Sequence, residues 1–225
     1  MFIPGSPLSE LSPLSETKKF DLSSLSLAYG QKPNSMGMAY EPVLTLTVKN
    51  LHSSSLTHMG LIIDGVNYGR SSLKIPPGQL QEESINLPDI ILTSSRTYTI
   101  ELTFTFADGT YQTSTRSYTT PQFKGQVTVT ELTLELTTHL SYFHIELKNT
   151  GNLPTTQASC SLGGREGMVL MLYQHTMPSE IIKGGFSGIS SSMFEEGNAY
   201  SVAVQLTYAD GSKSNVQTSV IARSR

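Results

Sequence analysis

The sequence contains few charged residues, a single cysteine and no tryptophan. Charged residues make up 15% of the 225 residues, against about 25% in a typical globular protein. The net charge is −3 and Lys and Arg form no cluster, so the chain lacks the basic face that a nucleic-acid-binding protein needs. Cys160 has no partner for an intramolecular disulfide, which excludes a disulfide-stabilised scaffold, and we expect it to be a small buried apolar side chain.

The sequence also lacks a long hydrophobic run. No stretch of about 18 consecutive apolar residues is present, so we expect no membrane span in this chain. Residues 1–7 have neither the basic region nor the apolar core of a signal peptide. Two alternatives follow: a cytosolic protein, or one whose targeting or anchor segment is not part of this sequence. Serine and threonine take the place of charged residues, and this composition favours an extracellular or cell-surface location.

Two segments, one in each half of the chain, share one pattern. Tyr98–Gly109 has the sequence YTIELTFTFADG, and Tyr200–Gly211 has the sequence YSVAVQLTYADG. In both, apolar side chains alternate with polar ones, which is the period of a strand with one buried face. Both end in Ala-Asp-Gly. Asp-Gly between two β segments predicts a hairpin with a tight type I′ turn, in which both central residues have positive φ.

Further blocks upstream occur in the same order in both halves. Phe20–Tyr29 aligns with Val127–Leu136 without a gap, and the apolar phase slips by one residue after Leu22 and after Val129. A shared slip predicts a β-bulge at the same place in both copies. The remaining pairs of blocks are Leu44–Asn50 with Phe143–Asn149, and Ile75–Gly78 with Ile181–Gly184. Blocks that recur in one order indicate an internal repeat.

The repeat predicts an all-β chain of two tandem immunoglobulin-like (Greek-key) β-sandwich domains with an extended N-terminal arm. We expect about seven strands in each module, and a buried strand in the apolar run Gly167–Tyr173. Because the linker is short, the two modules should move little against each other. The predicted parts are a Pro/Ser-rich arm (1–19), module 1 (20–119), a linker (120–125) and module 2 (126–225).

The repeated blocks resemble a known family. The turn Lys148–Pro154 (KNTGNLP), a glycine turn after it, and a tyrosine strand that ends in Ala-Asp-Gly look like the CARDB-type and related immunoglobulin-like modules of archaeal secreted and cell-envelope proteins. The resemblance covers both modules but not the arm. Module 1 departs from the motif, with NLHS at Asn50–Ser53. The resemblance implies envelope attachment, filament building or adhesion, and it implies no chemistry.

Residues that could carry chemistry do not form a recognisable motif. Asp108 and Asp210 are explained by their hairpin turns, and the glycine-rich segments Gly163–Gly167 and Gly184–Gly188 are expected to be turns, since no helix follows them. We therefore expect no catalytic residue, no cofactor and no metal, and a protein that is not an enzyme. The histidines, none at metal-ligand spacing, are His52, His58, His139, His144 and His175.

The leading hypothesis is a structural or adhesive protein of the cell surface, which associates with itself or with other envelope proteins. In its filament version, an N-terminal arm adds a strand to an open sheet edge of a neighbouring copy. The strand-forming part of that arm is residues 20–29. Its candidate donor side chains are Phe20, Leu22, Leu25 and Leu27.

The alternative hypothesis is a module that binds a glycan or a protein within a larger envelope system. Such a module needs exposed aromatic side chains, and most Tyr and Phe residues here lie in phase with buried apolar positions. Three tyrosines lie less clearly in phase and form the candidate aromatic surface: Tyr68, Tyr111 and Tyr118.

Overall fold

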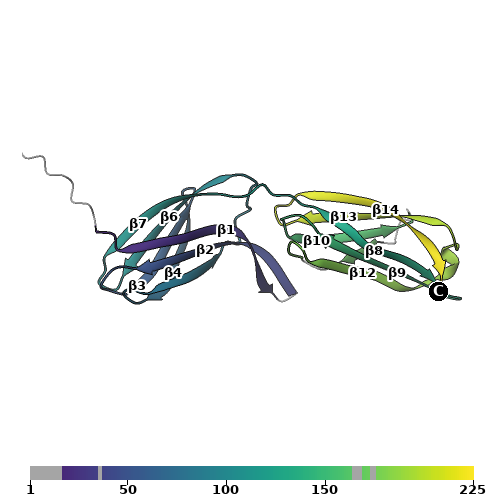
Figure 1. The fold of residues 1–225 in the computed structure, drawn as a ribbon, viewed down its shortest axis with the longest axis horizontal. Coiled ribbons are helices and arrows are strands. Elements are labelled where there is room, and N and C mark those ends of the chain that lie inside the picture. Colours follow the sequence, from purple (N-terminus) through teal and green to yellow (C-terminus); the bar gives the residue numbers. More distant parts are fainter. Residues whose placement is uncertain (1–16, 35–36, 164–168, 173–175) are drawn as a thin grey trace, which may run out of the picture.

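The protein is all-β, and its two sandwiches follow each other end to end along one axis (Figure 1). The structure, a computed structural model, describes residues 17–34, 37–163, 169–172 and 176–225. Most of the expected N-terminal arm, residues 1–16, lies outside the described residues. No helix in the described part of the chain is long and apolar enough to span a membrane.

Module 1 is a sandwich of two antiparallel sheets. The order β1-β2-β5 in one sheet and β4-β3-β6-β7 in the other is that of an immunoglobulin-like Greek key. The strands are β1 (Phe20–Asn34), β2 (Gly37–Asn50), β3 (Leu56–Ile63), β4 (Val66–Ile75), β5 (Leu80–Asn86), β6 (Thr97–Phe106) and β7 (Tyr111–Thr119).

Module 2 repeats this topology. Strands β8, β9 and β12 correspond to β1, β2 and β5, and β11-β10-β13-β14 corresponds to the second sheet. The bounds are β8 (Val127–Leu136), β9 (Leu140–Asn149), β10 (Thr155–Leu162), β11 (Val169–Leu172), β12 (Ile181–Ser190), η1 (Ser191–Met193), β13 (Ala199–Tyr208) and β14 (Lys213–Ser224).

The modules differ where the two sheets meet. In module 2 the end of β14 pairs in parallel with the end of β8, from Ala222↔Leu134 to Ser224↔Leu136, and this joins both sheets. In module 1, β7 ends at Thr119 and the chain turns into the linker at Pro121, which has no N–H to donate. Both copies therefore have the same strand order, but only in the second copy does a strand pair, β14 with β8, join the two sheets.

Each predicted strand with alternating side chains buries one face. Along β6 and β13, the apolar side chains from Ile100 to Phe106 and from Val202 to Tyr208 are buried, whereas the side chains between them are partly or fully exposed. Burial of side chains of this size removes apolar area from water and contributes about 1.5–3 kcal/mol each. Two cores of comparable size follow, one in each sandwich.

The predicted slip in the first strand of each copy is a β-bulge. The register of β1 on β2 shifts between Leu22 and Ser24, and that of β8 on β9 shifts between Val129 and Glu131. Both shifts occur at the same position of the repeat. The extra residue turns the following side chains to the other face of the strand, as the apolar pattern requires.

The expected type I′ turns at Ala-Asp-Gly are wrong in type. Only Gly109 and Gly211 have positive φ there, and each glycine N–H donates to the carbonyl three residues earlier. This is a type I turn followed by a left-handed glycine. Asp108 and Asp210 instead accept hydrogen bonds from the N–H and hydroxyl two residues later. A turn with two positive φ values occurs at Asp64-Gly65, between β3 and β4.

One pair of predicted blocks was aligned wrongly. The buried Asn50 donates to the Ile75 carbonyl, and the buried Asn149 donates to the Thr176 carbonyl. The turn that follows Ile75 therefore corresponds to the turn that follows Thr176, and its left-handed residues are Gly78 and Ser179. Ile181–Gly184 lies inside β12 and matches the start of β5. The glycines at 184, 185 and 188 are likewise residues of β12 and not a turn, and a Cβ added at Gly185 would lie 2.2 Å from the Phe143 carbonyl oxygen.

Gly167–Tyr173, predicted as a buried strand, contains β11. Its backbone pairs with β10 from Ser161↔Val169 to Ala158↔Leu172. Of the predicted strand Gly167–Tyr173, residues 167, 168 and 173 lie outside the described residues. Of the predicted turn Gly163–Gly167, only Gly163 is described.

Candidate functional site

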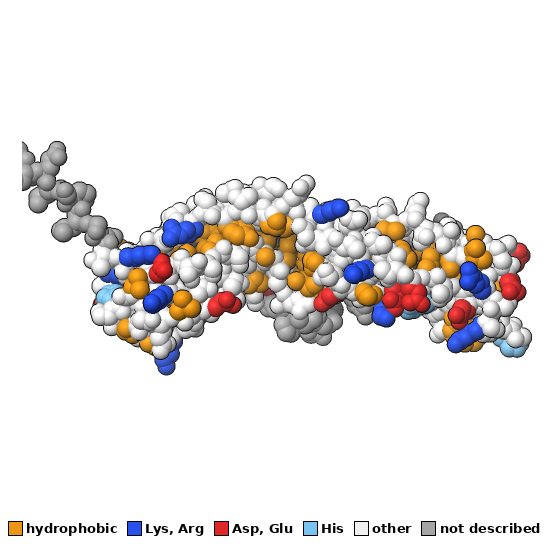
Figure 2. All heavy atoms as spheres, viewed as in Figure 1, with side chains coloured by type: hydrophobic (Ala, Val, Ile, Leu, Met, Phe, Trp, Pro, Cys, Tyr) orange, Lys and Arg blue, Asp and Glu red, His pale blue; other side chains and the backbone are white. Residues whose placement is uncertain are grey.

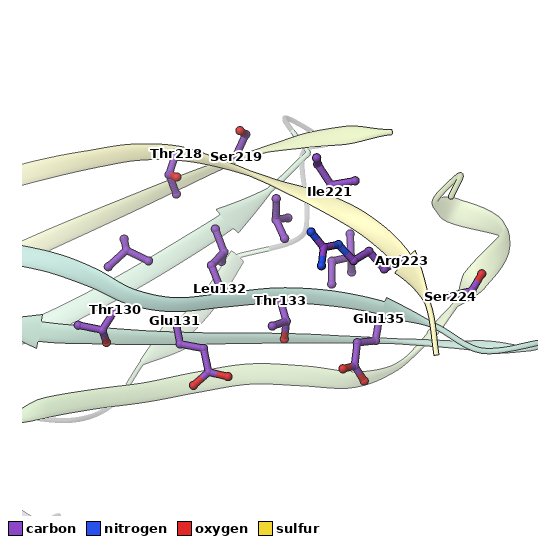
Figure 3. A pocket seen from close by; sticks show the side chains of 13 residues that line it. Thr130, Glu131, Leu132, Thr133, Glu135, Thr218, Ser219, Ile221, Arg223 and Ser224 are labelled. Carbon is purple, nitrogen blue, oxygen red and sulfur yellow. The ribbon is translucent and has the colours of Figure 1, made fainter. Parts of the chain in front are cut away.

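A groove lies between β8 and β14 (Figure 3). It has a volume of about 610 Å³. The two strands pair over only three residues at their ends, so upstream they diverge and leave the β8 edge without a ladder on that side. Figure 3 shows Leu132 and Arg223 pointing into this space. Val129 and Leu132 are half-buried here, and Ile221 is 49% exposed.

The chemistry of this groove suits an extended peptide more than a reaction. Its floor is apolar, its rim carries Thr and Ser hydroxyls, and its charged side chains are Glu131, Glu135 and Arg223. Glu135 and Arg225 form an ion pair at 3.4 Å near its end. An unpaired strand edge beside alternating apolar positions is the usual setting for the addition of a strand from another segment.

A cluster of potential metal ligands lies on the outer face of β8 and β9. Glu131, His144 and Glu146 each offer one ligand atom, and these atoms lie within 4.8 Å of one another. The Lys183 ammonium forms an ion pair with Glu146 at 2.5 Å. The Lys183 hydrogen bond is the main cause that lowers the pKa of the Glu146 carboxyl. A metal would have to displace this lysine, so the cluster is first of all an ion-pair network.

The sequence pattern does not predict this cluster, because its members are adjacent only across a strand pair. The ladder places Glu131 opposite Glu146, and Thr133 opposite His144. The short hairpin after Leu136 is the signal that could have predicted the cluster. A short hairpin loop fixes which residues of the two strands pair, and this register holds from Leu136↔Ser141 to Glu131↔Glu146, where the bulge interrupts it.

The linker is docked between the modules and is not a free tether. Asn152 accepts a hydrogen bond from the Lys124 N–H at 2.6 Å and donates its own N–H to the Lys124 carbonyl at 3.0 Å. The Asn152 amide also donates to the Gln122 carbonyl. At Gly151, an added Cβ would lie 2.0 Å from the Lys124 carbonyl oxygen, and at Gly125 it would lie 2.4 Å from the Tyr208 ring. Both glycines allow the linker to approach module 2 this closely.

Two aromatic side chains join the cores of the modules. Tyr29 and Phe123 contact each other at 5.9 Å between ring centroids, and both pack against the cores of module 1 and of module 2. Burial raises the pKa of Tyr29 to about 12, while the hydrogen bond from the Leu92 N–H opposes this and the Asp210 carboxylate adds to it. Asp210 belongs to module 2, so Tyr29 lies at the junction itself.

The β1–β2 hairpin extends past its sheet toward module 2 (Figure 1). β2 pairs with β5 only from Val43 to Lys49, whereas its pairing with β1 continues to Asn34↔Gly37. Tyr40 on this extension is buried, and burial is the main cause that raises its pKa. The charge of Glu180 also raises the pKa of Tyr40, and a hydrogen bond from the Met177 backbone lowers it. No pattern in the sequence predicts this contact with module 2.

The candidate donor residues belong to the sheet of their own module. Phe20 and Leu27 are buried in the module 1 core, and Leu22 and Leu25 pack against it. All four lie on β1, which pairs with β2 along its length. In this structure the segment is therefore a strand of its own sandwich and not an arm. To donate it, module 1 would have to expose part of its core.

The three candidate tyrosines do not form one surface. Tyr68 is on β4 and Tyr118 on β7, at opposite edges of the four-stranded sheet, and both are half-buried against the module 1 core. Tyr111 is 69% exposed. It lies an odd number of residues from Tyr118 on the same strand, so the two side chains point to opposite faces.

Three further titratable side chains are His52, Asp108 and Cys160. His52 Nε2 lies 3.1 Å from the Asp108 carboxylate, and its ring makes a tilted contact with Phe106 at 4.7 Å between ring centroids. The N–H and hydroxyl of Thr110, and then the charge of His52, hold the pKa of Asp108 below its ordinary value. Cys160 is buried, and burial raises the pKa of its thiol to about 11, which is the opposite of what a nucleophile needs.

No protein-family model matches the chain, and no curated protein matches it. Similar solved structures include the FN1-FN3 domains of chicken CNTN1, at 10% identity over 90% of this chain and 67% of that chain, with a TM-score of 0.28. Dimeric latent PorU from Porphyromonas gingivalis is similar at 14% identity over 92% of this chain and 20% of that chain, with a TM-score of 0.32. Streptomyces avermitilis alpha-L-rhamnosidase is similar at 12% identity over 88% of this chain and 24% of that chain, with a TM-score of 0.28. The chain spans 31% of the red sea bream transglutaminase that it also matches. The fold class follows from the sheets themselves.

Proposed function

We propose that this protein is a non-enzymatic structural or adhesive component of the cell surface, in which two sandwiches form one stiff rod. The observation that carries the proposal is the docked linker. Asn152 holds the linker by three hydrogen bonds, and Tyr29 and Phe123 bury the junction. A flexible tether would need none of these contacts.

A rod of this kind suits a spacer that holds two ends at a fixed separation. Conformational entropy opposes the ordering of a linker at about 1–2 kcal/mol per residue, so an ordered linker requires compensating contacts of this kind. Figure 2 shows the Lys and Arg side chains scattered over one face among uncharged atoms, without a basic patch. The Ser/Thr-rich surface and the similarity of the repeated blocks to CARDB-type envelope modules support an extracellular role.

Assembly by strand addition is the filament version of this proposal. The groove between β8 and β14 supplies an acceptor edge with half-buried Val129 and Leu132. Since β1 is part of its own sheet, its donation to a neighbour would be an exchange of β1 between copies. Electron microscopy of the purified protein, with and without residues 1–30, tests this version. Filaments that persist without residues 1–30 would contradict it.

Antibody labelling of intact cells that carry the native gene tests the location. We expect labelling without permeabilisation, together with loss of attachment or envelope integrity when the gene is deleted. Labelling that appears only after permeabilisation would contradict the proposal. The separate expectation of no enzymatic activity would fail if the purified chain turned over a substrate and a single substitution abolished that turnover.

A binding module for a glycan is the second candidate, and the exposure of Tyr111 favours it. Aromatic rings that stand free of the core are the usual platforms for sugars, and Tyr111 is 69% exposed on β7. A glycan array with the wild-type chain and the variant Tyr111→Ala tests this. Tyr118→Ala is the matched control, because Tyr118 packs against the core. Saturable binding that Tyr111→Ala abolishes and Tyr118→Ala preserves would favour this candidate.

A further inference from the structure

The outer face of β8, β9 and β12 brings an imidazole and two carboxylates together. Glu146 on β9 lies between Glu131 of β8 and Lys183 of β12. His144 lies two residues before Glu146 on the same strand and therefore on the same face. The His144 Nε2 atom is 3.4 Å from the Glu146 carboxylate and 3.9 Å from the Glu131 carboxylate.

These separations are close to those that a single metal ion imposes on its ligands. Zn²⁺ binds imidazole nitrogens and carboxylate oxygens at about 2.0–2.2 Å in a tetrahedral arrangement, which places two of its ligand atoms about 3.4 Å apart. The three ligand atoms of the cluster all lie within 4.8 Å of one another. Small rotations of partly exposed side chains therefore bring all three atoms to one ion.

The cluster carries more negative than positive charge. Glu131 and Glu146 lie directly opposite each other on the β8–β9 ladder, and like charges in such a cross-strand pair destabilise a sheet. The Lys183 ammonium pairs with Glu146 at 2.5 Å and brings one positive charge to two negative ones. Because the lysine side chain is 63% exposed, it can move into water when a divalent cation takes its place.

The imidazole is open to solvent on this face. The cross-strand neighbours of His144 are Thr133 on β8 and Gly185 on β12, and both are small. Figure 3 shows the Glu131 side chain on the side of β8 away from Leu132. The face therefore has room for a water molecule as the fourth ligand of a zinc site with three protein ligands.

Module 1 has hydroxyl groups at the three equivalent positions. By the repeat and its register, these are Ser24, Thr45 and Thr47. Ser24 and Thr47 form a hydrogen bond with each other at 2.7 Å. The sandwich is thus built with uncharged side chains on this face in one copy, so the fold itself does not require the two carboxylates and the imidazole of the other.

We propose that Glu131, His144 and Glu146 bind one divalent transition-metal ion of the Zn²⁺ type, and that Lys183 holds the Glu146 carboxylate when no ion is bound. The mixed nitrogen and oxygen ligands favour Zn²⁺ over Ca²⁺ and Mg²⁺, which prefer oxygen ligands alone. The ion links β8 to β9 on the surface of module 2. This inference departs from the sequence-based expectation of no metal, and it does not depend on the proposed role at the cell surface.

Calorimetric titration of the chain, without a histidine tag, with ZnCl₂ from about 1 μM to 1 mM tests the proposal. We expect saturable binding by the wild type, and weaker binding of CaCl₂. Loss of a residue that only orients a metal ligand costs about 10–100-fold in affinity, so Glu131→Gln and His144→Gln should each weaken zinc binding by at least about 10-fold. His139→Gln is the matched control at an exposed histidine between β8 and β9, and it should bind zinc like the wild type.

The variant Lys183→Met gives the sharpest result, because it removes the competing cation and keeps most of the side-chain length. It should bind zinc more tightly than the wild type, and equal or weaker binding would overturn the proposal. A wild-type chain without saturable zinc binding overturns it as well, and so does binding that Glu131→Gln and His144→Gln leave unchanged. Circular dichroism should show that each variant is folded, and His144→Thr, which introduces the residue that module 1 has there, replaces His144→Gln if that variant does not fold.

Discussion

The substitution Gly151→Ala should open the junction while it leaves module 2 folded. An added Cβ would lie 2.0 Å from the Lys124 carbonyl oxygen, whereas ordinary contact begins at 3.4 Å. The linker must therefore move by about 1.4 Å (3.4 minus 2.0). Neither the alanine Cβ nor the Lys124 carbonyl oxygen can rotate away, because the backbone fixes the position of each. The equivalent position in module 1 is His52, so the turn itself accepts a side chain, and only the approach of the linker demands glycine.

Two hydrogen bonds are lost when the linker moves. They are Gly151 N–H to Gln126 O and Asn152 N–H to Lys124 O, both at 3.0 Å. At about 1 kcal/mol each, their loss costs about 2 kcal/mol and raises the open population roughly 30-fold. Cleavage that follows the open population should accelerate by the same factor.

Limited trypsin digestion measures this opening, since Lys124 is exposed but its backbone is held. The products are residues 1–124 and 125–225, identified by mass. Thr150→Ala is the control, because it alters the same turn without an added Cβ. Thermal unfolding should show that module 2 of the variant remains folded. Cleavage of Gly151→Ala at the wild-type rate would refute the reasoning.

Three further predictions concern buried groups. Asn50→Ala and Asn149→Ala each remove three hydrogen bonds of the asparagine side chain, so at about 1 kcal/mol per bond each should lower the free energy of unfolding by about 3 kcal/mol in denaturant titrations. A loss below about 1 kcal/mol in either variant would contradict the equivalence of the copies. Cys160 should resist a thiol reagent at about pH 8 in the native protein and react after unfolding, since burial raises its pKa to about 11; fast native labelling would show an open core. Tyr29, whose pKa is raised from 10.0 to about 12, contributes stability that is fully present below pH 10 and is lost as the pH rises through about 12. Ultraviolet titration of Tyr29→Phe should therefore show one late-titrating tyrosine fewer than the wild type.

The repeat made much of the fold predictable. Alternation in Tyr98–Phe106 and Tyr200–Tyr208 located the central strands, and the phase slip after Leu22 located a bulge. These features are local, because side-chain period and turn residues are dictated by a few neighbouring positions. The turn type at Asp108 was wrong, because Asp-Gly fits both a type I′ turn and a type I turn with a following left-handed glycine.

The functional surfaces were less predictable, because they depend on what lies across space. The alignment of Ile75–Gly78 with Ile181–Gly184 failed, since the true marker is a hydrogen bond from Asn149 and not a glycine. Phe20 and Leu27 have the same alternation whether they pair within their own sheet or with a neighbour, so the sequence could not separate an arm from a first strand. The docked linker depends on Asn152, whose partners are set by the packing of two modules.

The central claim is that the two modules form one stiff body. Residual dipolar couplings of backbone amides in both modules test it most directly, because each module reports its own alignment. The account predicts that one alignment tensor fits module 1 and module 2 together, and that Gly151→Ala separates them into two tensors. Two tensors of different magnitude in the wild-type chain would contradict the account.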